Sequence, residues 1–407
     1  METHVFFLNL LALLLAARIL AETAARLQVP PVLGELAAGV ILGPSLLGWL
    51  APDEVIKLLA EIGIILLLFE VGLETDIRRL VNAGRQSVLV AVAGFVAPFL
   101  LGYGLARYGF DQPMLTALFI GGTLTATSIG ITIRVLTDLR RQHAREGQVV
   151  LGAAVLDDVF GVILLALLYE FSIAGGVSPT HAGKVLLFVT LFFLLAPLAA
   201  RLMSGVIQRI DRQTEIPGLI PTSIVSLVLF FAWLAHAVGA PELLGGFAAG
   251  LALSRRFFLP FGVALHSDPG FAHRIGEQMK PIIQLFTPIF FVMVGLSLNL
   301  REIDWGSPFI WLFSSAFFLV AVAGKFLGAL LLREPWPMRT VIGMAMVPRG
   351  EVGLIFAELG RVSGVFDNEV YAGMVIVIAL TTLLPPLIMK AFYHRHGQQM
   401  EPPEARP

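Results

Sequence analysis

Two adjacent carboxylates, Asp157 and Asp158, lie within the apolar stretch GAAVLDDVFG at residues 152–161. The surrounding apolar run extends from about Gly147 to Tyr169, which places Asp157 roughly 15 Å along a helix from the start of the run. That depth is near the centre of a bilayer, where each ionised Asp costs about 3 kcal/mol to insert. Successive residues point about 100° apart on a helix, so one structural partner does not easily serve both. The pair therefore indicates a functional site, with purely structural ion pairing as the alternative.

Lys325 is a candidate partner for these carboxylates, in the stretch AGKF at residues 323–326. It lies about 12 Å along the helix from the end of its apolar run at Arg333, with snorkelling to the interface as the alternative. Burial disfavours the charged forms of carboxylate and ammonium groups, so both can exchange protons near neutral pH. Carboxylate oxygens also suit a small hard cation that has shed part of its water. One site that accepts either a cation or protons, but not both, is the minimum that antiport requires.

Two apolar segments contain residues that interrupt a helix. Residues 121–128 read GGTLTATS, where glycines and hydroxyl groups weaken helical continuity, and residues 346–351 read MVPRGE, where Pro348 removes a backbone donor. Irregular backbone at membrane depth occurs only where protein or a water-filled cavity satisfies its polar groups. We therefore predict two discontinuous helices that cross in the core, rather than ordinary proline or glycine kinks.

Polar side chains accompany both breaks. Thr127 and Ser128 either supply oxygen ligands to a cation or only cap a half-helix. We interpret Arg349 and Glu351, two residues apart, as structural charges that pair with each other or with groups of the broken backbone. Their direct participation in transport is the alternative.

Composition places the whole chain in a membrane. Of its 407 residues, 57% are hydrophobic and 14% are charged, and the mean hydropathy is +0.84. A soluble domain has nearer a quarter of charged residues. The net charge of −1 gives no sign of nucleic-acid binding, and the absence of cysteine excludes thiol redox chemistry and thiolate metal sites. The start of the chain, METH, has no basic segment or cleavage site, so we expect a retained first helix.

The elements that must position these residues are long apolar runs that recur along the chain. An all-α polytopic fold of about thirteen transmembrane helices is predicted, each run being sufficient to cross about 30 Å of hydrocarbon. The expected spans are 4–26, 32–50, 54–76, 84–107, 113–138, 145–172, 181–209, 216–239, 241–257, 276–299, 307–332, 336–360 and 369–394. The loop 258–275 is expected to lie along the membrane interface.

Basic residues gather in alternate loops. One set of loops contains pairs such as Arg78–Arg79, Arg140–Arg141 and Arg255–Arg256. The opposite set contains only Lys57, Arg107, Lys184, Arg301 and Arg361. The positive-inside rule therefore predicts a multi-pass protein of a bacterial inner membrane, with the N-terminus outside and the C-terminus in the cytoplasm.

The chain also repeats itself. The stretch LGELAAG at residues 33–39 resembles LGGFAAG at residues 244–250, and VGL at residues 71–73 recurs 223 residues later at 294–296. The paired helices are seven apart, so the copies cross the membrane in opposite directions. We predict two inverted repeats of six helices, joined by a linker helix over residues 181–209. Such repeats are typical of secondary transporters, whose site lies between the copies near the midplane.

With these motifs, the sequence resembles the bacterial NapA-type Na⁺/H⁺ antiporters of the monovalent cation–proton antiporter superfamily, to which the Kef-type K⁺/H⁺ proteins also belong. The resemblance covers almost the whole chain. The motifs that carry it are ATSIGIT at residues 126–132, GAAVLDDV at 152–159, GK at 324–325 and PRGEVGL at 348–354.

The resemblance implies roles for individual residues. Asp158 would be the principal carrier of cation and proton, and Asp157 would form a salt bridge with Lys325 that opens when the cation binds. Paired aspartates resemble the electrogenic members, in which more than one proton exchanges per cation. Na⁺ or Li⁺ and H⁺ would be the substrates, with Asp157 and Asp158 as Na⁺ ligands, and no cofactor is implied.

The resemblance also implies a homodimer in lipid that works by an elevator mechanism. Two domains, each built from two parts, would move relative to one another. The scaffold would comprise residues 1–76 and 213–300, the mobile core residues 77–173 and 301–396, the linker residues 174–212, and the cytoplasmic tail residues 397–407.

The sequence therefore favours a Na⁺(Li⁺)/H⁺ antiporter, with a K⁺/H⁺ antiporter as the closest rival. A gated cation channel or a membrane sensor is the alternative from another class, but the charged groups concentrate at one repeat interface, which favours alternating access. An enzyme is not expected, because zinc-type His spacing, a Gly-rich phosphate loop and a plausible Ser/His/Asp arrangement are all missing.

Overall fold

Every regular element in the described residues of the computed structural model is a helix, and these residues contain no strand. The described positions are residues 3–27, 29–51, 53–74, 84–128, 131, 132, 136, 139, 141, 144–174, 176, 177, 180, 183, 187, 218–237, 242–253 and 269–396. For residues 3, 269–273, 351 and 386 only the backbone is described. The expected helix over residues 181–209 therefore lies outside the described residues, apart from isolated positions.

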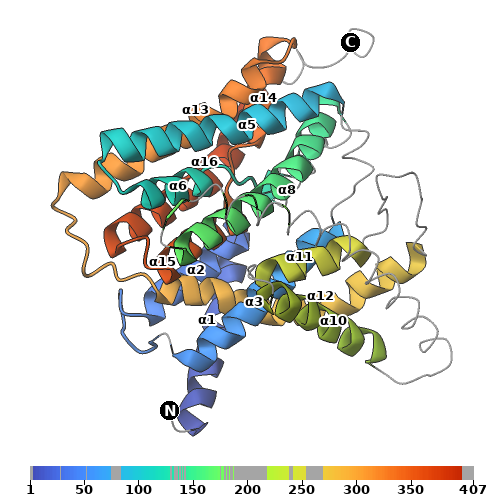
Figure 1. The fold of residues 1–407 in the computed structure, drawn as a ribbon, viewed down its shortest axis with the longest axis vertical. Coiled ribbons are helices and arrows are strands. Elements are labelled where there is room, and N and C mark those ends of the chain that lie inside the picture. Colours follow the sequence, from blue (N-terminus) through green and yellow to red (C-terminus); the bar gives the residue numbers. More distant parts are fainter. Residues whose placement is uncertain are drawn as a thin grey trace. The chain divides into compact units, whose positions relative to one another are not determined.

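Figure 1 shows the described helices in chain order. They are α1 (Thr3–Arg26), α2 (Pro31–Leu42), α3 (Glu54–Glu74), α5 (Arg85–Gly104) with its π-helical extension η1 (Leu105–Gly109), α6 (Met114–Thr123), α8 (Arg145–Ile173), α10 (Leu219–Ala237), α11 (Glu242–Leu253), α12 (Pro269–Leu296), α13 (Pro308–Leu330), α14 (Trp336–Ala345), α15 (Gly350–Val362) and α16 (Asn368–His396). Of these, α1, α5 with η1, α8, α10, α12, α13 and α16 are long and apolar enough to cross a membrane. The expected all-α polytopic fold is confirmed, while the inverted-repeat layout remains a prediction.

Four expected helices have clearly different bounds, and the one expected over 113–138 begins as α6, which ends at Thr123. The helix expected over 32–50 ends at Leu42, because Pro44 has no N–H to continue it. The helix expected from residue 276 begins at Pro269, since proline is favoured in the first turn, so residues 269–275 of the expected interfacial loop are helical. The helix expected over 336–360 is two helices, α14 and α15, as its predicted break requires.

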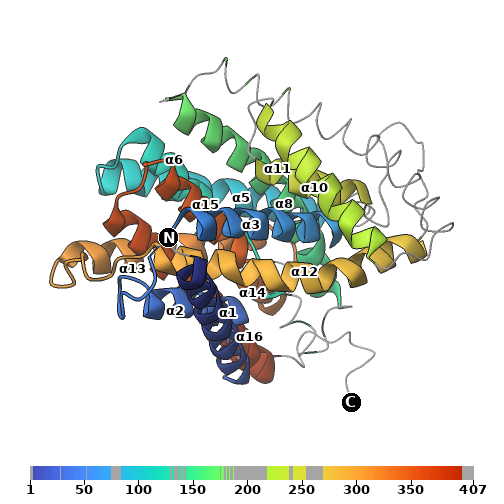
Figure 2. The same ribbon diagram turned by 90° about the horizontal axis from the view of Figure 1, so that it is seen from below.

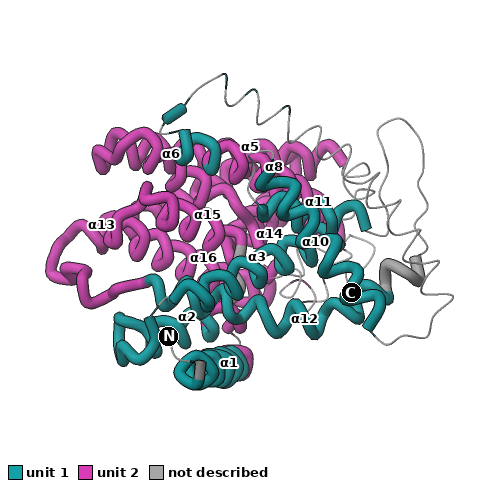
Figure 3. Tube along the Cα trace, turned by 60° about the horizontal axis from the view of Figure 1, so that its bottom comes forward, with its two compact units in different colours: residues 1–23, 34–81, 169–297 teal, residues 24–33, 82–168, 298–407 magenta. Residues whose placement is uncertain are grey.

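The contacts divide the chain into two compact units, shown in teal and magenta in Figure 3. Unit 1 comprises residues 1–23, 34–81 and 169–297, and unit 2 comprises residues 24–33, 82–168 and 298–407. Unit 1 contains most of α1 and α2 together with α3 and α10 to α12. Unit 2 contains α5, α6, most of α8 and α13 to α16, and with them every described residue of the predicted site.

Unit 1 is held together by helices that approach at glycines. The helix α3 lies against α11 and α12 (Figure 2). A Cβ atom on Gly72 of α3 would collide with the carbonyl oxygen of Phe247, and one on Gly250 of α11 with that of Phe69. Small residues at a helix interface let backbones approach closely, which replaces the hydrophobic effect as a source of stability in lipid.

We expect Gly39→Ala to destabilise unit 1. Gly39 of α2 faces Gly295 of α12, and a Cβ atom on Gly39 would collide with the carbonyl oxygen of Val292. The backbones must separate, at a cost of about 1–3 kcal/mol. The thermal midpoint in detergent measures this effect. Gly104→Ala is the matched control, because a Cβ atom there meets no atom within 4 Å, and an unchanged midpoint for Gly39→Ala would contradict the close packing.

Unit 2 places Lys325 by the same means. The helix α13 lies along α5 (Figure 1), and a Cβ atom on Gly324 would be 2.6 Å from the Cα atom of Pro98 in α5. A Cβ atom on Gly94 of α5 would lie 3.5 Å from Cδ of Lys325, which is ordinary van der Waals contact, so the lysine stem packs directly against α5. Close packing at small residues therefore buries the charged Lys325 side chain where α13 contacts α5.

Candidate ion-binding site

The two predicted interruptions are present and similar in form. The helix α6 ends at Thr123 and α14 ends at Ala345. Pro113 and Pro335 precede them as N-caps. After each last turn the backbone stays irregular, through residues 124–128 and 346–349 respectively.

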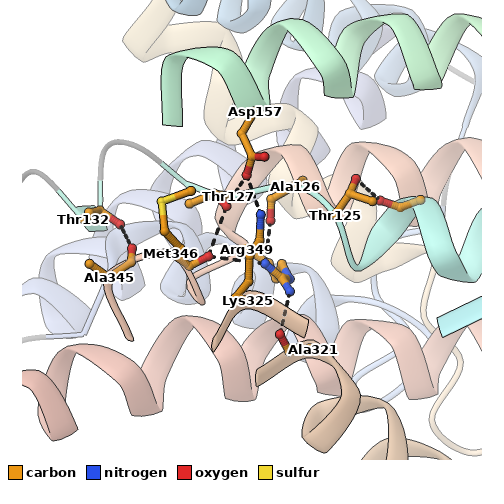
Figure 4. A network of polar contacts seen from close by, with 11 residues as sticks. Thr125, Ala126, Thr127, Thr132, Asp157, Ala321, Lys325, Ala345, Met346 and Arg349 are labelled. Carbon is orange, nitrogen blue, oxygen red and sulfur yellow. Dashed lines mark hydrogen bonds and ion pairs between the residues drawn. The ribbon is translucent and has the colours of Figure 1, made fainter. Parts of the chain in front are cut away.

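Hydrogen bonds join the two interrupted regions, and Figure 4 shows the one between Thr132 and Ala345. The Ser128 N–H donates to the Pro348 carbonyl at 2.7 Å, and the Thr132 hydroxyl donates to the Ala345 carbonyl at 2.7 Å. Because Ala345 is the last residue of α14, its carbonyl has no partner within the helix. Each segment therefore satisfies polar groups that the other leaves without helical partners, as a break at membrane depth requires.

Asp157 projects from α8 toward this junction, as Figure 4 shows. Its Oδ2 atom accepts hydrogen bonds from Lys325 Nζ at 2.5 Å and from the Thr127 hydroxyl at 2.6 Å. Lys325 is fully buried and Asp157 is 1% exposed. The ion pair is therefore shielded from water, which strengthens its attraction and makes the loss of either partner costly.

Two features leave this carboxylate able to take another ligand. Its Oδ1 atom is buried and has no hydrogen-bond partner among the described residues. The Thr127 hydroxyl also lies 3.1 Å from the Met346 carbonyl, and its single proton can serve only one acceptor at a time. Thr127 can therefore turn from Asp157 to Met346 without losing a hydrogen bond.

Asp158 follows on α8 and is 8% exposed. As the neighbour of Asp157 in the chain, it lies close to the same junction. Its side chain leaves α8 about 100° from that of Asp157. Ser128 is fully buried, and its backbone contact with Pro348 fixes its place beside the second break.

Arg349 is fully buried and joins three chain segments. One terminal nitrogen donates to the Ala126 carbonyl at 2.9 Å and also lies 3.5 Å from the Met346 carbonyl. The other donates to the Ala321 carbonyl of α13 at 3.1 Å (Figure 4). Ala126 and Met346 follow the C-terminal ends of α6 and α14, where the helix dipoles concentrate negative charge. The guanidinium therefore neutralises both ends, while the Glu351 side chain lies outside the described residues.

The start of α15 depends on a residue that sequence did not single out. Gly350 has φ +49, and a Cβ atom there would lie 2.6 Å from Cβ of Ser128. Its N–H donates to the Thr382 hydroxyl of α16 at 3.2 Å. Thr382 and Thr132 were not predicted, because threonines are common in apolar helices and spacing alone does not show which of them face a break.

The junction brings two carboxylates, a lysine and an arginine into one buried region. With all four charged, the formal charges cancel. An additional cation would leave an uncompensated charge in a low-dielectric setting unless a proton left. The described residues contain no group of three or more His, Asp or Glu side chains placed to hold a metal ion.

Comparison with known proteins agrees with this chemistry. The family model for "sodium/hydrogen exchanger, transmembrane" matches residues 10–392. The chain belongs to the sodium/hydrogen exchanger family. It is therefore a multi-pass membrane protein of a transporter family.

Individual exchangers match along nearly their whole length. The chain is 33% identical to the high-affinity Na⁺/H⁺ antiporter NhaS3 of Synechocystis, covering 98% of this chain and 92% of that protein. It is 33% identical to the Na⁺/H⁺-K⁺ antiporter GerN of Bacillus cereus, covering 97% and 98%. The sodium proton antiporter MjNhaP1 of Methanocaldococcus jannaschii shares its fold, with a TM-score of 0.65 at 17% identity over 97% of this chain and 98% of that one.

Proposed function

We propose that this exchanger is a Na⁺(Li⁺)/H⁺ antiporter in which cation and protons compete for Asp157 and Asp158. The observation that carries the proposal is the state of Asp157, a buried carboxylate with one oxygen held by Lys325 and Thr127 and the other without a partner among the described residues. A hard cation needs oxygen ligands and negative charge, and this is where the protein buries both.

The proposed cycle assigns a task to each charged group. Asp158 carries the cation in one direction and a proton in the other. The ion pair between Asp157 and Lys325 opens when the cation binds, after which Lys325 can release a proton. Thr127 and Ser128 supply oxygen ligands or keep the broken backbone in place, and Arg349 has a structural role. More than one proton then exchanges per cation, so transport is electrogenic.

The proposed movement is of the elevator type. Unit 2 contains the described site residues and would be the mobile core, whereas unit 1 would be the scaffold of a homodimer in lipid. The grouping of contacts into two compact units supports such a division. The expected orientation places the N-terminus outside and the C-terminus in the cytoplasm, on the distribution of basic residues.

A K⁺/H⁺ antiporter is the second candidate. It is favoured by the similarity to GerN, whose name includes K⁺ beside Na⁺. Selectivity between the two ions depends on cavity size and on the number of ligands, and the same buried carboxylates suit either ion.

Transport by purified protein in liposomes tests both candidates. Proton movement is followed after pulses of Na⁺, Li⁺ or K⁺, with and without an imposed membrane potential. We expect Na⁺ and Li⁺ to move protons, and we expect the rate to depend on the potential. Competition also predicts a pH dependence. Where one proton must leave for each cation, the Na⁺ concentration for half-maximal exchange falls about tenfold for each unit by which the pH rises. Exchange driven by K⁺ alone would select the second candidate.

Lys325→Met should shift the pH profile of exchange. Without the ammonium, Asp157 stays buried without its counter-charge and holds a proton more tightly. We expect the pH of half-maximal exchange to move by about one unit toward alkaline pH, and the charge moved per cation to fall. Liposome fluorescence and solid-supported membrane currents measure the two effects. Lys57→Met, at an exposed lysine, is the matched control, and an unaltered profile and current for Lys325→Met would remove Lys325 from the mechanism.

A further inference from the structure

Unit 2 contains a cluster of Arg141, Glu146 and Tyr393, in which Glu146 and Tyr393 are buried. Glu146 lies in the first turn of α8 and is 1% exposed. Its Oε1 atom accepts from Arg141 Nε at 2.8 Å and from the Tyr393 hydroxyl of α16 at 3.2 Å. The Arg141 guanidinium also lies over the Tyr393 ring, 5.7 Å from its centre. The cluster therefore joins the start of α8 to the end of α16.

A second cluster has the same three residue types. Glu358 of α15 accepts two hydrogen bonds from Arg361, at 3.0 and 2.6 Å, and one from the Tyr371 hydroxyl of α16 at 2.7 Å. The guanidinium again lies over the tyrosine ring, 5.6 Å from its centre, and Tyr371 is fully buried. This cluster joins the end of α15 to the start of α16.

The polar contacts of α16 follow a regular spacing. Tyr371, Thr382 and Tyr393 are eleven residues apart in each interval. Eleven residues are three helical turns to within about 20°, so the three side chains lie along one face of α16. The middle one, Thr382, accepts the N–H of Gly350 at the start of α15. One face of α16 therefore contacts α15 at both of its ends and α8 at its beginning.

The middle contact lies where α16 is weakest. Pro385 and Pro386 follow Thr382 within one turn and cannot donate to the carbonyls of Thr381 and Thr382. A side-chain contact at this level fixes the helix where its own hydrogen bonding is interrupted. The contact also serves the break itself, because the Gly350 N–H has no partner within α15.

The same spacing occurs on α8. Glu146 precedes Asp157 by eleven residues, so both lie on nearly the same face of this helix. A rotation or axial shift of α8 at Glu146 therefore moves Asp157 relative to Thr127 and Lys325. Because α8 is one continuous helix from Arg145 to Ile173, it transmits such a shift rigidly over three turns.

We propose that Tyr393 and Thr382 are positioning residues for ion binding. Through their contacts from one face of α16, they fix the position of Asp157 on α8 relative to the start of α15. This inference rests on the proposed exchange function and deepens it. Neither residue touches the ion. Tyr393 acts through Glu146, and Thr382 acts through the Gly350 backbone.

The alternative is that these contacts only stabilise unit 2. Two variants distinguish a positioning role from a purely stabilising one. Tyr393→Phe removes one hydroxyl and keeps the ring under Arg141. Thr382→Val removes the acceptor for Gly350, whereas Thr382→Ser keeps it and should restore wild-type behaviour. Tyr108→Phe is the matched control, since Tyr108 is 84% exposed.

Na⁺-driven exchange in liposomes gives the first readout. For Tyr393→Phe and Thr382→Val we expect the Na⁺ concentration for half-maximal exchange to change by about fivefold, with a shifted pH profile, as the loss of one hydrogen bond predicts. Thr382→Ser and Tyr108→Phe should leave both unchanged. A lower maximal rate and a lower thermal midpoint, with an unchanged half-maximal concentration and pH profile, would overturn the positioning role.

Hydrogen–deuterium exchange gives a readout that does not need transport. If Tyr393 positions α8, Tyr393→Phe should raise exchange about fivefold around Asp157 and at the start of α15, as well as near Glu146. Faster exchange confined to the first turns of α8 would overturn the proposal. Should the wild-type protein move no protons with any cation, the proposed function fails, and this measurement still decides whether the register depends on Tyr393.

Discussion

Asp158→Asn should reduce cation-driven proton movement at least about 100-fold. The amide has almost the shape of the carboxylate, but it neither binds a proton in the neutral range nor supplies negative charge to a cation. A site that alternates between ion and proton then loses both occupants in one step. Because the amide keeps the shape of the side chain, folded protein should persist, and the thermal midpoint checks that it does. Proton movement in liposomes after a Na⁺ pulse measures the loss.

Two comparisons make this result specific. Asp111→Asn applies the same change to a fully exposed aspartate and should leave exchange intact. Asp157→Asn removes the partner of Lys325 and should retain some exchange with an altered charge per cation, because Asp158 still binds the ion. Full exchange by Asp158→Asn in folded protein would refute its assignment as carrier. Equal and complete losses at both aspartates would instead indicate one joint site without separate roles.

The helices could be predicted because lipid imposes a simple rule on sequence. Every backbone polar group must be satisfied internally, so each crossing reads as a long apolar run. The wrong helix bounds occur where the apolar run in the sequence and the helix in the structure do not end at the same residue. Residues 43–50 are as apolar as a helix, yet Pro44 ends α2 at Leu42, and the polar residues before 276 hid the early start of α12 at Pro269.

The candidate site was predictable in its charges and not in its contacts. Depth in the membrane singles out Asp157, Asp158 and Lys325, since ionisable residues there are costly. Depth does not determine which oxygen meets which nitrogen. The contact of Lys325 with Oδ2 of Asp157, and the lack of a partner on Oδ1 among the described residues, follow from the rotation of α8 and α13, which depends on packing at residues such as Gly94 and Gly324.

Backbone partners are the least visible in sequence. Arg349 was expected to pair with Glu351 or with groups of the broken backbone, and its described bonds all go to carbonyl oxygens. Every residue has a carbonyl, so no residue type marks the one that will be left without a helical donor. The same reason explains why Thr132 and Thr382 were not singled out.

Arg349→Met should destabilise the protein more than any other single change considered for unit 2. It leaves the carbonyls of Ala126, Ala321 and Met346 without their charged donor, in a region the side chain fills completely. Removing one member of a buried charge network costs about 3–5 kcal/mol, a large part of the stability of a typical domain. We expect a thermal midpoint lower by many degrees and little folded protein. Arg333→Met, at an exposed arginine, should have almost no effect.

Arg349→Lys separates structure from transport at this position. Lysine keeps the charge but lacks the planar fork whose two terminal nitrogens reach Ala126 and Ala321. If Arg349 mainly holds the two half-helix ends, stability should recover only in part, and exchange should fall in proportion to the folded fraction. If the guanidinium instead takes part in ion movement, well-folded Arg349→Lys protein should show a changed pH profile or a changed charge per cation. That outcome would assign Arg349 a role in the transport cycle, in place of the purely structural role at the two helix ends.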